Sequence, residues 1–339
     1  MKLSILIKAF NEETMISNCL EAAVAEALKY GGEVILVDSL STDMTVEIAR
    51  RYPIRIVQFV HKADCGCASA VQLGYQYAHG EYLYILDGDM ELQYGFLSLA
   101  LNYLESNPDV AGVAGKLLDT SIKTRGDKRR ALRAAGLQEI TEVLDLGGGG
   151  LYRRKAIESI GYLAHRWLPA CEEAELGVRL RASGWRLIRL PEVAVLHTGH
   201  SENDMQMLCR LWRSRRMHAY GMYLRTAFGR PWWWLSVGQV WYVFAALSLH
   251  AVAIMLTIIG AIYTEITNPI FVLAVAELFV WFGVAVVLTV KKKSISGALF
   301  SVLEWHCYAL ALVLGFMTSV SSPMIPINGK ELNKPKILQ

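Results

Sequence analysis

The N-terminal part of the chain alternates short apolar runs with longer segments in which small and apolar residues recur at helical spacing. The apolar runs have the length of buried strands and lie at 3–7, 33–38, 54–59 and 81–87. The helical patterns lie at about 12–30, 43–51 and 66–79. Because strands that alternate with helices form crossover units, this pattern predicts an α/β domain with a mostly parallel, Rossmann-like sheet over residues 1–204.

Three long runs in the last third of the chain are almost free of charge, at 232–263, 269–290 and 298–320. Each has at least the roughly 20 residues that a helix needs to cross a bilayer. The first run is longer than that and predicts one tilted helix, with a short surface helix followed by a span as the alternative. The runs predict an α-helical membrane domain over 232–322, followed by a tail at 323–339.

The ionisable side chains inside these apolar runs are His250, Glu277, Glu304 and His306. Charges buried in lipid are costly and are often functional, so a path for a transported product is one interpretation. We favour the other, in which these side chains pair with one another between helices.

The segment between the two predicted domains, 205–231, contains six arginines and no acid, interleaved with apolar side chains. This composition predicts a basic amphipathic helix on an anionic membrane surface. The tryptophans at 232–234 follow it as an interface belt. The alternative is the solvated basic face of a soluble helix.

The distribution of positive charge predicts how the chain is oriented in the membrane. The N-terminal apolar stretch is too short for a signal peptide, so we expect the first domain in the cytoplasm, attached to the inner membrane by several spans. Lys291–Lys293 place the loop between the second and third runs in the cytoplasm and the loop 264–268 outside. Three crossings put the tail outside, although Lys330 and the other tail lysines favour the opposite side. A model with two spans, in which 298–320 is re-entrant or lies on the surface, stays open.

Composition excludes several classes of protein. The chain has 339 residues, 53% of them hydrophobic, and a mean hydropathy of +0.30, which is too apolar for an ordinary soluble domain. A net charge of +3 is too small for a nucleic-acid-binding protein. The six cysteines form no CxxC pair, so we expect reduced thiols.

Two carboxylates follow the fourth predicted strand. Asp87 and Asp89 stand at its carboxyl end, with Gly88 between them, where the backbone can come close to a ligand. Hard divalent cations prefer such oxygen ligands. An ordinary acidic turn is the alternative, since Asp and Gly are common in turns.

A second group of acids begins a predicted helix, with Glu172, Glu173 and Glu175 in its first turn. Acids in a first turn are favoured by the helix dipole, which accounts for one or two of them. A remaining carboxylate is a candidate base for an acceptor hydroxyl.

A glycine run precedes this helix and predicts a mobile loop that contacts substrate. We expect this loop and the two arginines after it to shape the acceptor side, through Gly148, Gly149, Arg153 and Arg154.

Taken together, these motifs over residues 1–200 resemble the family-2 nucleotide-sugar glycosyltransferases of the GT-A fold. The resemblance rests on the segments 5–13 and 37–45, on Asp87-Gly88-Asp89 and on Glu172-Glu173. It implies that a UDP- or GDP-sugar donor binds at Ala9, Phe10, Glu12, Asp38 and Asp87. It also implies that Asp87 and Asp89 hold Mn²⁺ or Mg²⁺, with Asp89 as the direct ligand, and that this metal neutralises the diphosphate leaving group.

Further roles follow from the same resemblance. Glu173 stands where the family commonly has the aspartate that acts as base, with Glu172 as the alternate, and Lys8 stands where the family commonly has proline. His197 matches a histidine near the metal or diphosphate, and His200 is a weaker match. Three residues loosely resemble the tryptophan motif of membrane synthases, and we expect them to contact acceptor phosphates or headgroups: Arg210, Trp212 and Arg213.

The sequence therefore predicts a metal-dependent, inverting glycosyltransferase on the membrane, with a lipid-linked or membrane-proximal acceptor in polysaccharide or glycolipid synthesis. A polyprenyl-phosphate glycosyltransferase is one alternative, whose ionised acceptor needs no base. A non-catalytic membrane scaffold that binds a nucleotide sugar is the other.

Overall fold

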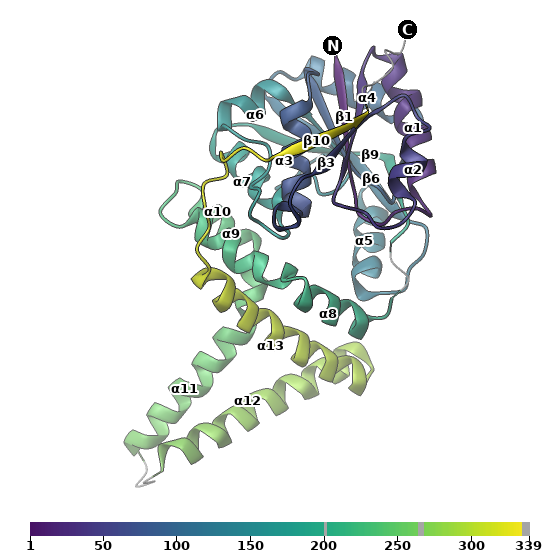
Figure 1. Cartoon of the computed structure of the whole chain (residues 1–339). Coiled ribbons are helices and arrows are strands. Elements are labelled where there is room, and N and C mark those ends of the chain that lie inside the picture. Colours follow the sequence, from purple (N-terminus) through teal and green to yellow (C-terminus); the bar gives the residue numbers. More distant parts are fainter. Residues whose placement is uncertain (200–201, 264–267, 334–339) are drawn as a thin grey trace. The chain divides into compact units, whose positions relative to one another are not determined.

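Figure 1 shows the computed structural model of the chain, which describes residues 1–199, 202–263 and 268–333. The chain divides into two compact units. The first unit comprises Met1–Met207, Gly229–Leu235 and Val320–Gln339, and the second comprises Leu208–Phe228 and Ser236–Ser319. His200 and most of the predicted outer loop, 264–267, lie outside the described residues.

The first unit is built on one sheet. Its strands are β1 (Leu3–Ala9), β2 (Glu33–Asp38), β3 (Arg55–Phe59), β4 (Tyr82–Asp87), β5 (Met90–Leu92), β6 (Val110–Asp119), β7 (Thr141–Glu142), β8 (Gly150–Arg153), β9 (Arg186–His197) and β10 (Gly329–Asn333). Their order is β10-β3-β2-β1-β4-β8-β6-β9-β5, and β7 pairs with β9. The predicted α/β fold is confirmed.

The sheet is parallel only in part. The strands β3, β2, β1 and β4 run parallel, with Ile7 of β1 level with Leu36 and Leu86. β6 and β9 are parallel to each other, whereas β5, β7, β8 and β10 run antiparallel to their neighbours. The prediction of a mostly parallel sheet holds for the four strands read from the sequence and is wrong beyond them.

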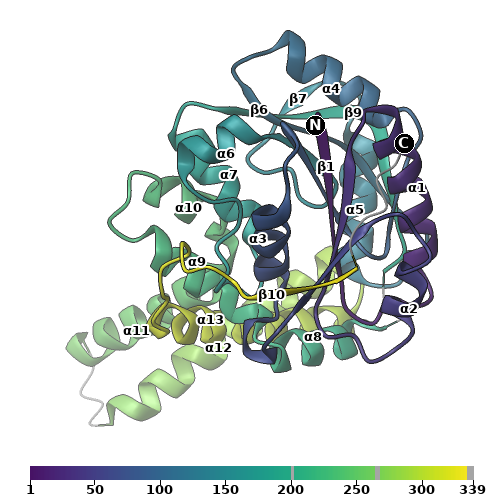
Figure 2. The same cartoon turned by 45° about the horizontal axis from the view of Figure 1, so that its top comes forward.

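Helices cover both faces of this sheet. They are α1 (Ile16–Lys29), α2 (Thr45–Ala49), α3 (Cys67–Tyr77), α4 (Phe96–Ser106), α5 (Arg125–Gly136), α6 (Arg154–Ile160) and α7 (Glu172–Ala182). Figure 2 shows α1 and α3 on opposite sides of β1. Leu3, Ile5 and Ile7 share the buried core with α1 and α4.

Successive side chains of a strand point to opposite faces of the sheet, and this alternation decides where Lys8 points. Gly74 of α3 lies against Leu6 and Val37, so the even-numbered residues of β1 face α3. Lys8 lies two residues after Leu6 and therefore projects from that face, at the carboxyl end of the strand.

The end of the chain returns to the first unit. β10 pairs with β3, with Lys330 level with Gln58, and forms the edge of the sheet next to the N-terminal strands (Figure 1). Before it, Arg166 donates to the carbonyl oxygens of Ile325 and Pro326 at 3.0 and 2.8 Å. The tail expected at 323–339 is part of the first unit over its described residues 323–333, because Arg166 holds residues 325 and 326 and β10 forms an edge of the sheet.

The second unit is helical. Its elements, some of which begin in the first unit, are α8 (Asp204–Arg213), α9 (Ala219–Ala227), α10 (Trp233–Gln239), α11 (Ala245–Tyr263), α12 (Pro269–Lys292) and α13 (Ile295–Met317). Within the described residues, three helical segments are long and apolar enough to cross a membrane. They are Trp241–Tyr263, Pro269–Lys292 and Ile295–Met317, with mean hydropathies of 2.2, 2.6 and 1.6.

Two predicted helices are divided in the structure. The run 232–263 is not the single helix expected, because α10 ends before Val240. The division agrees with the alternative of a short helix followed by a longer one, and the crossing of the membrane by the longer helix stays a prediction. The segment 205–231 is also not one helix, because Arg215 adopts the left-handed region with φ 57° between α8 and α9.

The pairing expected among the intramembrane ionisable residues is present for two of them. His250 Nδ1 lies 3.0 Å from both carboxylate oxygens of Glu277, and Trp281 also donates to Glu277 at 3.0 Å. The ring of His306 packs against Trp281 with centroids 4.2 Å apart.

Candidate active site

Two loops at the carboxyl ends of β1 and β2 are held together by polar contacts. Asn11 adopts φ 56°, and its side-chain oxygen accepts from the backbone N–H of Thr42 at 2.8 Å. Its own N–H donates to Ser41 at 2.9 Å, and the N–H of Glu12 donates to Thr45 at 2.8 Å. The loops therefore form one surface beside Ala9 and Phe10, and the Phe10 side chain is 56% exposed on it.

Asp38 holds the second of these loops from the protein interior. Its side chain is fully buried and accepts from the N–H of Ser41 and from Gln58 Nε2, the latter at 2.8 Å. The buried carboxylate thus fixes the second loop, and Gln58 is a partner that the sequence analysis did not identify. The predicted contact of Asp38 with a nucleoside stays a prediction.

Asp87 and Asp89 lie at the turn that follows β4. The N–H of Gly88 donates to the carbonyl of Lys8 at 2.9 Å, which holds this turn against the end of β1. A Cβ at Gly88 would lie 3.0 Å from Glu12 Cγ, so glycine lets the Glu12 side chain approach the two aspartates. Burial and the charges of Asp89 and Asp87 raise the pKa of Glu12 to about 7.

His197, at the end of β9, joins Asp89 to a second carboxylate. Its Nε2 lies 3.3 Å from Asp89 Oδ2, and its Nδ1 lies 2.6 Å from Asp119 Oδ1. Burial lowers the pKa of His197, but its contacts with Asp89 and Asp119 outweigh this and raise it to about 9. Asp119 is itself held by Arg130 at 2.9 Å. The sequence analysis missed Asp119, which lies far from the other motifs along the chain.

The surroundings of Asp89 fit a divalent cation. Asp89 Oδ1 is buried without a hydrogen-bond partner, which is costly for a carboxylate unless a cation compensates it. The 3.3 Å between Asp89 Oδ2 and His197 Nε2 is close to the separation of about 3 Å between neighbouring ligands of an octahedral cation. Within the described residues, no three His, Cys, Asp or Glu side chains group to hold a metal alone, so diphosphate or water would supply the other ligands.

Replacing Asp119 with asparagine is expected to weaken the binding of Mn²⁺ about 10- to 100-fold. The carboxylate favours the tautomer of His197 with its proton on Nδ1, which leaves Nε2 available to a metal, and a neutral amide does this less well. The measurement is calorimetric titration of Mn²⁺ into the protein without donor or acceptor.

The matched control is Asp109→Asn, which lies just before the other end of β6. Asp109 pairs with Arg186 at 2.9 Å on the surface, so its replacement should leave Mn²⁺ affinity unchanged. Equal affinities of the parent protein and Asp119→Asn would contradict the role given to Asp119.

The three glutamates in the first turn of α7 have different partners. Glu175 is buried, pairs with Arg179 at 2.7 Å and accepts from Tyr162 at 2.6 Å, which gives it a structural role. Glu172 is also buried and pairs with Lys8 Nζ at 2.8 Å. Glu173 is the more exposed of this pair and lies 4.0 Å from the same ammonium group.

Lys8 joins α7 to the turn that follows β4, because its Nζ also lies 3.1 Å from Asp87 Oδ1. Burial and the charge of Glu172 raise the pKa of Glu173 to about 8, while Lys8 opposes this rise. The structure therefore brings Asp87, Glu172 and Glu173 to one ammonium group at the carboxyl ends of β1 and β4. A carboxylate with such a pKa is suited to take a proton near neutral pH.

Comparison with known proteins gives a family match for the N-terminal part of the chain. Residues 4–161 match the model of the family Glycosyl transferase family 2. This segment is a family-2 glycosyltransferase domain. The matched residues include the loops after β1 and β2 and Asp87-Gly88-Asp89, and they end before Glu173 and His197.

Curated relatives of the domain match over short stretches. A dodecaprenyl-phosphate galacturonate synthase of Rhizobium johnstonii is 33% identical over 99 residues, which cover 27% of this chain and 29% of the relative. An uncharacterized glycosyltransferase of Escherichia coli, YibD, is 31% identical over 113 residues, or 32% of this chain and 33% of the relative. The chain thus spans a third or less of the length of these relatives.

A solved structure covers more of the chain. The mannosyltransferase PcManGT from Pyrobaculum calidifontis, in complex with GDP-Man and Mn²⁺, has a TM-score of 0.59 at 18% identity. The similarity covers 93% of this chain and 87% of that chain. It confirms the GT-A fold of the glycosyltransferase domain.

The glycine run of the glycosyltransferase domain is explained by packing. A Cβ at Gly148 would overlap Met90 Cε, and a Cβ at Gly149, where φ is 79°, would lie 3.0 Å from Val195 Cγ1. Gly150 begins β8 and is buried in the sheet. The prediction that the run needs glycine for mobility is wrong, although Gly148 and Gly149 do lie next to the strands that carry Met90 and Val195.

Arg153 and Arg154 of the glycosyltransferase domain lie away from the metal motif. Arg153 is level with Tyr82, at the start of β4, whereas Asp87 ends that strand. Arg153 donates to the carbonyl of Leu104 at 2.6 Å, and Arg154 donates to that of Gly80 at 2.6 Å. The predicted acceptor role of both arginines is wrong, because β8 runs antiparallel and carries them to the opposite edge.

Arg210, Trp212 and Arg213 lie on α8, in the second unit. Trp212 packs against the cluster of Leu208, Met217 and Ala311, and its ring lies 5.5 Å from that of His218. Their contacts with an acceptor or with headgroups stay predictions.

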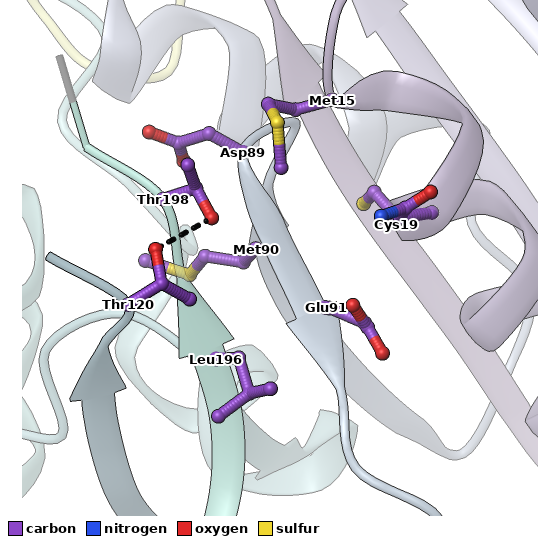
Figure 3. A pocket seen from close by; sticks show the side chains of 9 residues that line it. Met15, Cys19, Asp89, Met90, Glu91, Thr120, Leu196 and Thr198 are labelled. Atoms are coloured by element: carbon purple, nitrogen blue, oxygen red, sulfur yellow. Dashed lines mark hydrogen bonds between the residues drawn. The ribbon is translucent and has the colours of Figure 1, made fainter. Parts of the chain in front are cut away.

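A small cavity lies beside Asp89 in the glycosyltransferase domain, on the side of α1 (Figure 3). Cys19, Met90 and Leu196 contribute to its lining, and Thr120 and Thr198 hydrogen-bond across it at 3.1 Å. None of the predicted nucleotide-binding residues lines it, and Asp89 lines it as a predicted metal ligand. This cavity is therefore separate from the surface formed by the two loops.

Proposed function

We propose that the protein is a membrane-bound inverting glycosyltransferase that moves a sugar from a UDP- or GDP-sugar to a hydroxyl group of a lipid-linked or membrane-proximal acceptor. We further propose that it depends on Mn²⁺ or Mg²⁺ and serves polysaccharide or glycolipid synthesis. The observation that carries the proposal is the position of Glu173 beside Lys8 and Asp87. The family-2 domain supports it, as does a similar fold solved with GDP-Man and Mn²⁺.

Transfer forms a bond between the acceptor oxygen and the anomeric carbon and breaks the bond from that carbon to the diphosphate. In this proposal Glu173 takes the hydroxyl proton as the oxygen attacks from the face opposite the leaving group, which inverts the configuration. The nucleoside diphosphate leaves with the bonding electron pair. A metal held by Asp89 and His197 would supply positive charge to the leaving group when bound.

The donor-binding part of the proposal rests on the two joined loops. The Asn11 and Ser41 contacts hold the loops in one conformation before any ligand binds. Ala9 and the exposed Phe10 ring then offer a surface to a nucleobase, and Asp38 holds that surface in place. A preformed surface lowers the cost of ordering on binding.

Lys8 has a positioning role in the proposed reaction, and Lys8→Met tests it. Removing the ammonium leaves Asp87, Glu172 and Glu173 as mutually repelling carboxylates, so the pKa of Glu173 rises further above 8. We expect kcat/KM at pH 7 to fall about 10-fold or more, because one pKa unit changes the ionised fraction of a protonated base about tenfold. The measurement is a pH profile of kcat/KM.

Two results separate this role from a structural one. Lys8→Arg keeps the charge and should retain most of the activity at pH 7. Lys8→Met should recover activity as the pH is raised, whereas a uniform loss at every pH would contradict the role.

The membrane part of the proposal rests on apolar helices and basic segments. Three helical segments of the described chain have the length and composition to cross a bilayer. The six arginines of residues 205–231 and Lys291–Lys293 favour the cytoplasmic face of the inner membrane by the excess of positive charge. We place the glycosyltransferase domain on that face, where anionic lipids attract the arginines.

The experiment that tests the proposed function measures transfer of radiolabel from a panel of UDP- and GDP-sugars into bacterial lipid. The purified full chain is placed in liposomes with Mn²⁺, and a parallel reaction contains a chelator. Labelling of a lipid fraction that the chelator abolishes supports the proposal. Labelling that survives the chelator contradicts metal dependence, and no labelling from any donor contradicts a lipid acceptor.

A second candidate is a polyprenyl-phosphate glycosyltransferase, which the similarity to a dodecaprenyl-phosphate galacturonate synthase favours. Its phosphate acceptor is already ionised and needs no base. The product of this reaction is a sugar phosphate. Mild acid hydrolyses a sugar phosphate, whereas an ordinary glycoside resists mild acid. Retained activity in Glu173→Gln together with an acid-labile product would favour this candidate.

A further inference from the structure

We infer that the chain crosses the membrane twice, through α11 and α12, and that α13 begins and ends on the membrane face that carries the glycosyltransferase domain. The inference concerns only how the second unit lies in lipid, and it does not depend on the proposed reaction. It decides between the two membrane models that the sequence leaves open.

Both ends of the helical segment are joined to the first unit. The chain leaves the first unit after Leu235, forms α11, α12 and α13 in the second unit, and returns to the first unit at Val320. The return is fixed by β10 in the sheet, by Arg166 and by Trp167 Nε1, which donates to the carbonyl of Ser322 at 3.1 Å. The first unit is therefore present at the start and at the end of this segment.

A water-soluble α/β unit lies on one side of a bilayer, so the segment between its two parts must cross an even number of times. Three full crossings would put β10 on the side opposite β3, and the pair could not form. Only four residues lie between Met317 at the end of α13 and Ser322, so these two residues are at most about 18 Å apart. One of the three apolar helices therefore does not cross.

The distribution of charge identifies α13 as that helix. Lys291, Lys292 and Lys293 lie at its N-terminal end, where Lys292 also donates to Ser301 within α13. At its other end, Arg225 of α9 donates to the carbonyl of Phe316 at 3.4 Å and lies over its ring. Basic residues at both ends indicate that both ends lie at the same anionic surface.

The partners of α13 give an independent argument. Its buried face packs against α8, α9 and the turn Arg216–His218, through close contacts such as Gly221 and Gly315. α9 has nine residues, or about 14 Å, which is less than half of the roughly 30 Å hydrocarbon thickness. Because these short segments carry arginines, they belong at the headgroup level, and α13 runs beside them.

The opposite face of α13 is a single apolar stripe. Its exposed large apolar side chains recur at helical spacing, and they are Ile295, Leu299, Leu303, Leu310, Val313, Leu314 and Met317. α12 differs, because Leu288 is its one buried residue among those described and it exposes apolar side chains on most sides. One lipid-facing stripe opposite a basic surface is the pattern of a helix that lies along a membrane.

Labelling of single introduced cysteines in sealed vesicles tests this topology. The full chain carries Tyr263→Cys at the end of α11, Lys291→Cys before α13 or Ser321→Cys after it, all at exposed positions. A membrane-impermeant maleimide is added from one side, and labelled peptides are identified by mass. The native Cys209, exposed on α8, marks the face of the basic segment in every variant.

We expect positions 291 and 321 to react from the same face as Cys209, and position 263 to react from the opposite face. Labelling of positions 291 and 321 from opposite faces would overturn the inference, because α13 would then cross. Labelling of position 263 from the face of Cys209 would overturn it as well, because α11 and α12 would not cross.

A second measurement guards against a variant that misfolds. Lys330 and Gln58 are level with each other across β10 and β3, so cysteines at both positions should form a disulfide in the membrane-bound chain. Each single cysteine variant is the control. Failure of the pair to cross-link under oxidation would remove the first argument and overturn the inference.

Discussion

Replacing Glu173 with glutamine is expected to lower the rate of sugar transfer by about 10³-fold, within the range that a general base contributes. Glutamine keeps the size of the side chain but cannot take a proton from an acceptor hydroxyl. The affinity for the donor should change little, because Glu173 belongs to α7 and not to the two loops that we propose bind the donor. The measurement is kcat for transfer together with calorimetric binding of the donor.

Matched glutamate variants separate the base from its neighbours. Glu172→Gln removes a buried partner of Lys8 and should reduce activity less than Glu173→Gln does. Glu105→Gln, whose carboxylate pairs with Lys2 on the surface, should behave as the parent protein. A larger loss in Glu172→Gln would transfer the role of base to Glu172, and full activity in Glu173→Gln would exclude Glu173.

The pH profile gives the same assignment a second readout. The raised pKa of Glu173, about 8, means that the carboxyl is mostly protonated below pH 8 and ionised above it. Only the ionised form takes a proton, so kcat/KM should rise with pH and level off above about pH 8 in the parent protein. This rise should be absent from the residual activity of Glu173→Gln.

Replacing Asp89 with asparagine is expected to lower transfer by at least about 10²-fold and to abolish the stimulation of donor binding by Mn²⁺. The buried, unpartnered Oδ1 and the neighbouring His197 are the reasons for which we propose Asp89 as a direct metal ligand. A neutral amide binds a hard cation less strongly than a carboxylate does. Donor binding is measured by calorimetry with Mn²⁺ and with a chelator.

The control for Asp89 is Glu91→Gln, an acid two residues further along that lines the neighbouring cavity. This replacement should leave the Mn²⁺ dependence of donor binding unchanged, because Glu91 is not one of the ligands proposed for the metal. If the chelator has no effect on donor binding by the parent protein, the metal assignment fails, whatever the activity of Asp89→Asn.

The sequence by itself determined the elements that depend on local pattern. The four apolar runs became β1, β2, β3 and β4, because buried strands have a short length and a composition that are visible in one stretch of chain. The same reasoning found Asp87 and Asp89, since a polar residue after a buried strand stands at the carboxyl edge of a parallel sheet. Long apolar runs likewise revealed α11, α12 and α13.

Only the tertiary structure decided which of these side chains work together. Lys8 and Glu173 are 165 positions apart, and Asp119 and His197 are 78 apart, so no local pattern reports that they meet. The sequence does not exclude Arg153 from the site, whereas the antiparallel direction of β8 places it at the wrong edge. The C-terminal segment gave no strand signal, and its pairing with β3 depends on an edge supplied by residues far earlier in the chain. Hydrogen bonds and ion pairs between distant segments depend on topology, and for this reason the sequence revealed the chemical groups while the fold determined their partners.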